Sequence, residues 1–270
     1  MAKGEGLAPA MTYPFYIILG LAPSIIWLLF FLRKDVHPES NRMILKIFFG
    51  GMLAAVIAAV IQIGIFSGLS WLGKNLVGTF PILFFVFYHF IVIALVEEFA
   101  KYLIVKEKVI NDPEFDEPVD AMLYMIIAAL GFAALENLLV LFPGKEPFLF
   151  KQTAAISSFR FIGATFLHAL CSGTLGYFLA LSIFEPKRKI KLILTGIIIA
   201  TILHGLFNIS IIKLGESVAV INNKLVIIDF PIFIFSFVFL IALLTGLALF
   251  VSFGFKKLKK IASICKVTRY

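Results

Sequence analysis

The chain has 270 residues, of which 61% are hydrophobic and only 15% are charged, and its mean hydropathy is +1.04. Soluble domains carry about 25% charged residues, so this composition excludes a water-soluble globular protein and indicates that lipid is the solvent. The net charge of +8 does not indicate nucleic-acid binding, because the basic residues cluster between apolar runs.

Seven apolar segments follow one another along the chain. Each is long enough to cross a bilayer as a helix, and backbone hydrogen bonding in hydrocarbon excludes open sheet. We therefore predict an all-α, multi-pass bundle in the cell membrane, forming a single integral membrane domain over 1–270. The predicted helices are 13–32, 43–66, 80–105, 120–142, 155–184, 190–213 and 227–253.

The loop charges predict the orientation of these helices. Sixteen basic residues follow the first, third, fifth and seventh segments, whereas six lie in the alternate loops and the N-terminal segment. The positive-inside rule then places the N-terminus outside and the C-terminus in the cytoplasm. Gly64 and Gly68 form a GxxxG pattern in the second segment, which is too common to predict a helix contact by itself.

Ionisable side chains inside the predicted helices are the informative residues. Each charge at a helix centre costs about 2.5–3.5 kcal/mol on insertion scales, so such residues are functional candidates that must face one another or a wet cavity. The set comprises Glu97, Glu98, Lys101, Glu136, Arg160, His168 and His204. For Arg160 we favour a structural role, in which it snorkels or pairs with a carboxylate.

Helical spacing places partners beside several of these residues. Glu97 and Lys101 share a face, whereas Glu98 is rotated by about 100° and can meet a different neighbour. His168 with Ser172, and His204 with Asn208, are also four residues apart. Straight helices would separate Glu97 from Glu136 by about 14 Å in depth, so tilt or a shifted third helix must bring them closer.

Two carboxylates and two imidazoles on neighbouring helices suit peptide hydrolysis. A glutamate can activate water, and histidines with Asn208 can stabilise an oxyanion. Alternatively, His168, His204 and Glu136 could bind Zn²⁺, although the HExxH motif is absent. Residue types alone leave both versions open, as they leave open a proton-coupled transporter and a non-catalytic binding or immunity protein.

Four motifs in order resemble those of the PrsW family of intramembrane proteases, relatives of the CAAX-processing and Abi membrane proteins. They are Glu97-Glu98-Phe99-Ala100-Lys101, the segment Gly131 to Asn137 (GFAALEN), His168 with Ser172, and His204 with Asn208. The resemblance covers residues 80–213, which we expect to form the catalytic core. It implies cleavage of a membrane-anchored protein such as an anti-sigma factor.

The resemblance also implies roles for individual residues. Glu97 would be the water-activating base, Glu98 its supporting carboxylate, and Lys101 their counter-charge. His168 and His204 would be transition-state stabilisers or metal ligands, with Asn137, Ser172 and Asn208 in support. Glu136 stands where CAAX-type relatives have a histidine, so its role is not carried over from them.

Overall fold

A computed structural model of the chain describes residues 13–34, 39–72, 80–110, 112–142, 150–221 and 224–262. Within these ranges, seven helical segments are long and apolar enough to cross a membrane. They are Tyr13–Leu32, Asn41–Leu69, Pro81–Lys108, Pro118–Leu141, Thr153–Phe184, Pro186–Glu216 and Phe230–Ile261. The predicted all-α, multi-pass membrane bundle is therefore confirmed, whereas the orientation of its termini stays a prediction.

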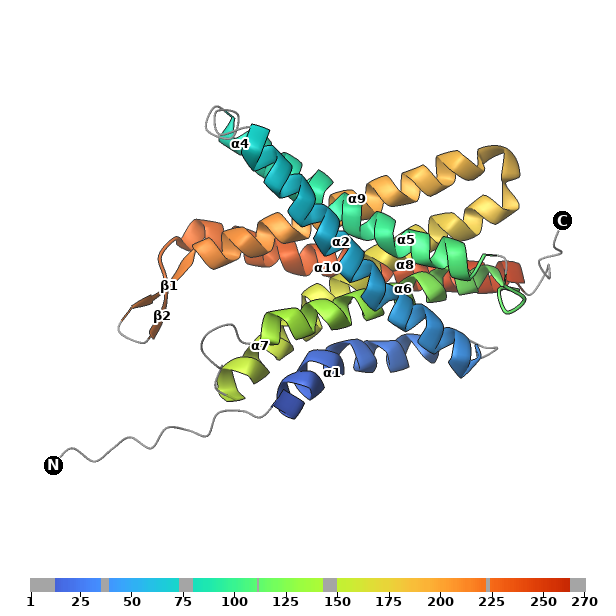
Figure 1. Cartoon of the computed structure of the whole chain (residues 1–270), viewed down its shortest axis with the longest axis horizontal. Helices are drawn as coiled ribbons and strands as arrows, with labels where there is room; N and C mark the ends of the chain where they lie inside the picture. The colour runs from blue at the N-terminus through green and yellow to red at the C-terminus, as the bar shows by residue number, and fades with distance from the viewer. Residues whose placement is uncertain are drawn as a thin grey trace.

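The helices alternate in direction across the bundle (Figure 1). In chain order the elements are α1 (Tyr13–Leu32), α2 (Asn41–Leu72), α4 (Pro81–Phe87), η1 (Tyr88–Leu95), α5 (Val96–Lys108), α6 (Pro118–Leu141), α7 (Phe150–Ile162), α8 (Ala164–Phe184), η2 (Pro186–Arg188), α9 (Lys189–Glu216), β1 (Val218–Ile221), β2 (Lys224–Ile227) and α10 (Phe230–Ala262).

Helix α6 forms the centre of the bundle. It packs against α8, α2 and α1, and its side chains from Pro118 to Ala134 are buried without interruption. By contrast, α10 exposes large apolar side chains such as Phe235 along its length. In a chain that crosses a membrane, this apolar surface faces lipid, so only the centre of the bundle is shielded from it.

Glycines allow α2 and α6 to approach closely. A Cβ atom at Gly131 would lie 1.9 Å from the carbonyl oxygen of Phe48, and one at Gly51 would lie 2.0 Å from that of Ala128. The GxxxG pattern does not mark this contact, since no described atom lies within 4 Å of a Cβ placed at Gly64 or Gly68. Backbone contact at Gly51 and Gly131 therefore holds α2 against α6.

Two of the predicted spans are not uniform α-helices. The third changes to a π-helix over η1, directly before Glu97. The fifth is interrupted at Gly163, between α7 and α8. The indole Nε1 of Trp27 donates a hydrogen bond to the Phe161 carbonyl oxygen at 2.8 Å beside this break. Both irregularities change the register of the residues that follow, so the depths of these residues differ from those in straight helices.

A β-hairpin that the sequence analysis did not anticipate joins α9 to α10. Strands β1 and β2 pair antiparallel, with Val218 opposite Ile227 and Ile221 opposite Lys224. It lies at the left of Figure 1, beyond the end of α9. The predicted seventh helix began at residue 227, whereas α10 begins at Phe230.

Candidate active site

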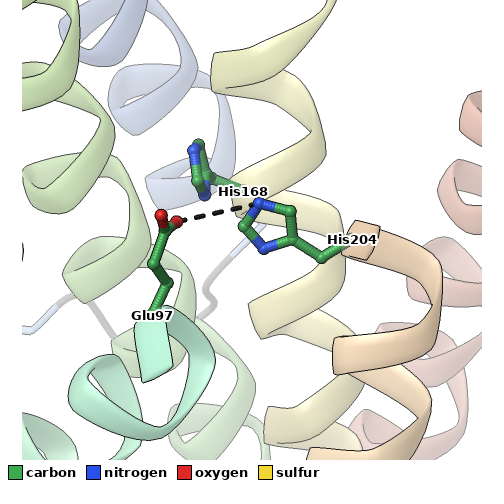
Figure 2. A group of neighbouring side chains, drawn as sticks. All are labelled: Glu97, His168 and His204. Carbon is green, nitrogen blue, oxygen red and sulfur yellow. Dashed lines mark ion pairs between the residues drawn. The ribbon is translucent and has the colours of Figure 1, made fainter. Parts of the chain in front are cut away.

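Helices α5, α6, α8 and α9 direct their ionisable side chains to one buried cluster. Glu97 and Glu98 come from the first turn of α5, His168 from α8 and His204 from α9. All four residues are buried. Figure 2 shows Glu97, His168 and His204 pointing toward one another from three helices. Straight helices would keep Glu136 away from Glu97, yet Glu136 also reaches this cluster, since its Oε2 lies 2.7 Å from His168 Nε2.

The carboxylate of Glu98 is fully paired. Its Oε1 lies 2.7 Å from Lys101 Nζ and 2.9 Å from His204 Nδ1, and its Oε2 accepts a hydrogen bond from Ser172 Oγ at 2.8 Å. Lys101 also lies over the ring of Phe132, with its Nζ 4.4 Å from the ring centroid. This buried ion pair explains how α5 carries a lysine inside the bundle.

The neighbouring carboxylate of Glu97 is only half satisfied. Its Oε1 accepts a hydrogen bond from Gln62 Nε2 at 3.1 Å. Its Oε2 is buried, has no hydrogen-bond partner within the described ranges, and lies 3.7 Å from His204 Nε2. A buried carboxylate oxygen is costly to leave unpaired, so this atom is available for a water molecule or a metal ion.

The hydrogen bonds of each histidine define which nitrogen carries a proton. Because Glu98 only accepts, His204 donates from Nδ1, and in its neutral form the ring presents the lone pair of Nε2 toward Glu97. At His168, the ammonium of Lys101 donates to Nδ1 at 2.7 Å, so Nε2 carries the proton and donates to Glu136 Oε2 at 2.7 Å. His204 therefore has a free lone pair, whereas both nitrogens of His168 are engaged.

Glu136 connects the cluster to a more exposed group. Its Oε2 lies 3.3 Å from Arg160 Nη2, and these two side chains are 29% and 20% exposed. Arg160 Nε donates to Asn137 Oδ1, and Asn137 Nδ2 donates to Thr165 Oγ1 at 3.0 Å. The carboxylate pairing that we predicted for Arg160 is present, and Thr165 is a partner that the sequence analysis missed.

One group of side chains has the composition and spacing of a metal site. Glu97, His168 and His204 each offer one ligand atom, and these atoms lie within 4.8 Å of one another. Tetrahedral ligands at about 2.0–2.1 Å from Zn²⁺ are separated by roughly 3.4 Å. Glu97 Oε2 and His204 Nε2 are 3.7 Å apart, and the separations within the group reach up to 4.8 Å, so the side chains would have to move slightly closer to hold an ion. The residues fit a metal ion, provided that Nε2 or Nδ1 of His168 releases its present partner.

Spacing paired Lys101 with Glu97 and Ser172 with His168, whereas both side chains contact Glu98 in the structure.

The structure arranges the other sequence candidates differently from the expectation in three respects. Glu97, rather than Glu136, completes the metal-compatible group with the two histidines. Asn208 is half-buried and has no hydrogen-bond partner among the described side chains. Gln62 contacts Glu97 although α2 lies outside the predicted catalytic core. The sequence signal for Gln62 is weak, since it is only a lone amide in an apolar run.

Comparison with known proteins identifies the family. The model of the PrsW family of intramembrane metalloproteases matches residues 39–244. The Protease PrsW of Geobacillus kaustophilus is 29% identical over 194 residues, which cover 71% of this chain and 77% of that protein.

Two further proteins named Protease PrsW give similar values. The one from Bacillus subtilis is 29% identical over 203 residues, covering 74% of this chain and 84% of that protein. The one from Clostridioides difficile is 24% identical over 199 residues, covering 71% of this chain and 76% of that protein. No solved structure is significantly similar to the chain. The family match resolves the alternatives left open by the residue types in favour of proteolysis: the chain belongs to the PrsW family of intramembrane metalloproteases.

Proposed function

We propose that this protease cleaves a membrane-anchored protein substrate and that Glu97 is its central catalytic residue. The motif resemblance suggests an anti-sigma-factor-like protein as the substrate class. The observation that carries the proposal is the unpaired Oε2 of Glu97, which lies 3.7 Å from His204 Nε2 in a buried setting. A proton-accepting oxygen next to an imidazole lone pair suits the activation of water for attack on a carbonyl.

Glu97 is the proposed general base. Gln62 holds Oε1 in place at 3.1 Å, which leaves Oε2 as the atom that receives the proton of the attacking water. The second glutamate cannot easily do this, because Lys101, His204 and Ser172 occupy both oxygens of Glu98. Glu98 is therefore proposed as a positioning residue that fixes the tautomer and the ring orientation of His204.

The two histidines are proposed to act on the carbonyl side of the reaction. Their ring centroids are 4.9 Å apart and their planes are nearly perpendicular, at 88°. A histidine that carries its proton on Nε2, as His168 does, can donate to a developing oxyanion after releasing Glu136. Arg160 would then neutralise the released Glu136 carboxylate, to which it is already paired.

The residues that would hold a metal ion are Glu97, His168 and His204. We propose Zn²⁺, because two histidines and one glutamate are a ligand set of catalytic zinc sites and because the matched family is described as metalloproteases. When bound, the ion would polarise the scissile carbonyl and make a bound water more acidic. In that version Glu97 and His168 would be metal ligands instead of the base and the proton donor described above. The metal content of the purified protein and of its variants decides between the two versions.

Cleavage of a single-span substrate by the purified protein tests the proposal. The Glu97→Gln variant should lose cleavage while it keeps its thermal stability, and Glu107→Gln, an exposed glutamate on the same helix, should keep full activity. Metal analysis of both variants shows which role Glu97 has. If Glu97 is a metal ligand, Glu97→Gln loses metal that Glu107→Gln keeps; if Glu97 is only the base, both variants keep it. Full activity of Glu97→Gln would remove Glu97 from the mechanism, and loss of activity in both variants would indicate a nonspecific effect.

A further inference from the structure

A cavity of about 630 Å³ lies away from the catalytic cluster, where α1, α7, α8 and α10 meet. Its walls are mainly aromatic and aliphatic, and they include Trp27, Phe31, Phe166, Leu170 and Val251. Its volume is in the range of pockets that bind small organic ligands, about 300–1,000 Å³. None of the metal-compatible residues lines it.

Three lysines give one end of this cavity a positive charge. Lys34, at the end of α1, and Lys256 and Lys259, near the end of α10, all line the cavity. None of these ammonium groups has an acidic partner among the residues described, although Lys34 Nζ lies over the Phe30 ring, 4.8 Å from its centroid. Adjacent Lys257 differs, because it donates to Tyr177 Oη at 2.9 Å.

The apolar part of the cavity continues along α10, away from the lysines. A second hollow of about 400 Å³ shares Phe166, Ala248 and Ser252 with the first and extends to Ile241. Leu249 on its wall is 68% exposed, so the hollow opens onto the lipid-facing surface of the bundle. Together the two hollows form one elongated apolar groove with cationic groups at a single end.

We propose that this groove binds one anionic phospholipid, with its phosphate at the three lysines and an acyl chain along α10. The charge and the shape of the groove match the two parts of such a molecule, and basic pockets between membrane helices bind anionic headgroups. Lysine stems can lie along the acyl chain while the ammonium groups reach the phosphate.

The position of the groove argues against a substrate helix as its occupant. Phe166 and Leu170 precede and follow His168 by two residues, which places them on the opposite face of α8. A peptide seated against them is therefore separated from Glu97 and His204 by α8 itself. A lipid in the groove would instead pack against the face of α8 that is opposite His168.

Native mass spectrometry of the purified protein, titrated with phosphatidylglycerol or phosphatidylcholine, tests this site. We expect one phosphatidylglycerol to bind at least about tenfold more tightly than phosphatidylcholine. The Lys34→Gln/Lys256→Gln/Lys259→Gln variant should bind phosphatidylglycerol about 100-fold more weakly, since each basic residue near an anionic headgroup is worth roughly fivefold in affinity.

Two further variants separate this groove from a general effect of surface charge. Lys187→Gln/Lys189→Gln/Lys191→Gln removes the same charge near the start of α9 and should leave binding of the tight lipid unchanged. Ser252→Trp fills the groove with all lysines intact and should weaken binding at least about tenfold. Equal weakening by both triple variants, or equal affinity for the two lipids, would overturn the proposal. So would full competition by inorganic phosphate, which would indicate a simple anion site, or by a single-span substrate peptide.

Discussion

Glu97 and Glu98 are adjacent in sequence, yet their carboxylates have opposite surroundings. Glu98 is fully paired, whereas one oxygen of Glu97 has no partner in the described part of the chain. The 100° rotation between successive helical residues produces this difference, because it directs one carboxylate to Lys101 and Ser172 and the other to Gln62. A tandem pair of acidic residues can therefore divide into a reactive group and a structural one.

Removing the positive charge beside Glu98 should destabilise the protein. Lys101→Met leaves the Glu98 carboxylate buried with only its neutral donors, and we expect a loss of about 3 kcal/mol in the free energy of unfolding. The Glu98→Gln/Lys101→Met double variant should recover part of this loss, because neither charge remains. Thermal unfolding in detergent measures the stability of the single and the double variant. Lys108→Met, on the exposed surface of α5, is the control. A Lys101→Met protein as stable as the control would contradict the prediction.

Replacing His204 should affect turnover more than substrate binding. His204→Ala removes the imidazole that faces Glu97, and we expect kcat to fall by about 10²- to 10³-fold with little change in KM. Steady-state kinetics with a single-span substrate measures the two constants separately. His89→Ala is the matched control, since the Nδ1 of His89 lies 2.8 Å from the Phe85 carbonyl oxygen, within its own helical segment. A change in KM alone would make His204 a recognition residue.

Loss of the Gln62 amide should reduce catalysis without unfolding the protein. Gln62→Leu keeps the side chain's approximate size but removes the donor to Glu97 Oε1, and a hydrogen bond to a charged group is worth about 1.5–3 kcal/mol. We expect kcat to fall about tenfold or more, together with a loss of about 1.5–3 kcal/mol in the free energy of unfolding that leaves the protein folded. An unchanged kcat would show that Glu97 does not depend on α2 for its position.

Metal content should distinguish Glu97 from Glu136. If zinc is held by Glu97, His168 and His204, elemental analysis should find about one equivalent in the purified protein and in Glu136→Gln, but little in Glu97→Gln or His168→Ala. Chelation should abolish cleavage, and added Zn²⁺ should restore it. The reverse pattern, with zinc lost only from Glu136→Gln, would favour the ligand set that the sequence suggested.

The close approach of α2 and α6 should be sensitive to a single methyl group. Gly131→Ala places a Cβ 1.9 Å from the Phe48 carbonyl oxygen, so the helices must separate, and we expect a loss of about 2 kcal/mol or more. Gly64→Ala, on the partner helix α2, should be neutral or slightly stabilising, because nothing described lies within 4 Å of the added atom. Equal stability of the two variants in a thermal unfolding assay would refute the packing argument.

The sequence predicted the helical spans well because hydropathy over about 20 residues depends on the bilayer and little on neighbouring helices. The details that place the site depend on packing between helices. The π-helix before Glu97 and the break at Gly163 change side-chain directions, and neither leaves a clear mark in an apolar run. For the same reason, the pairing of His168 with Glu136 rather than Ser172 could not be read from spacing.

The hairpin was missed for a different reason. Apart from Lys224, its strands consist of β-branched and other apolar residues, and a short run of this kind cannot be distinguished from the start of an apolar helix by hydropathy. Gln62 was missed because one amide in an apolar helix is common. Only the position of α2 against α5 makes it a partner of Glu97.

Hydrogen bonds run without interruption from Arg160 through Glu136, His168, Lys101 and Glu98 to His204. The effect of changing one member will therefore depend on the identity of the others, so substitutions in this set should be strongly epistatic. Diversification of the enzyme, in nature or in the laboratory, would then require coordinated replacement of several members at once, because single exchanges would pass through inactive or poorly folded intermediates.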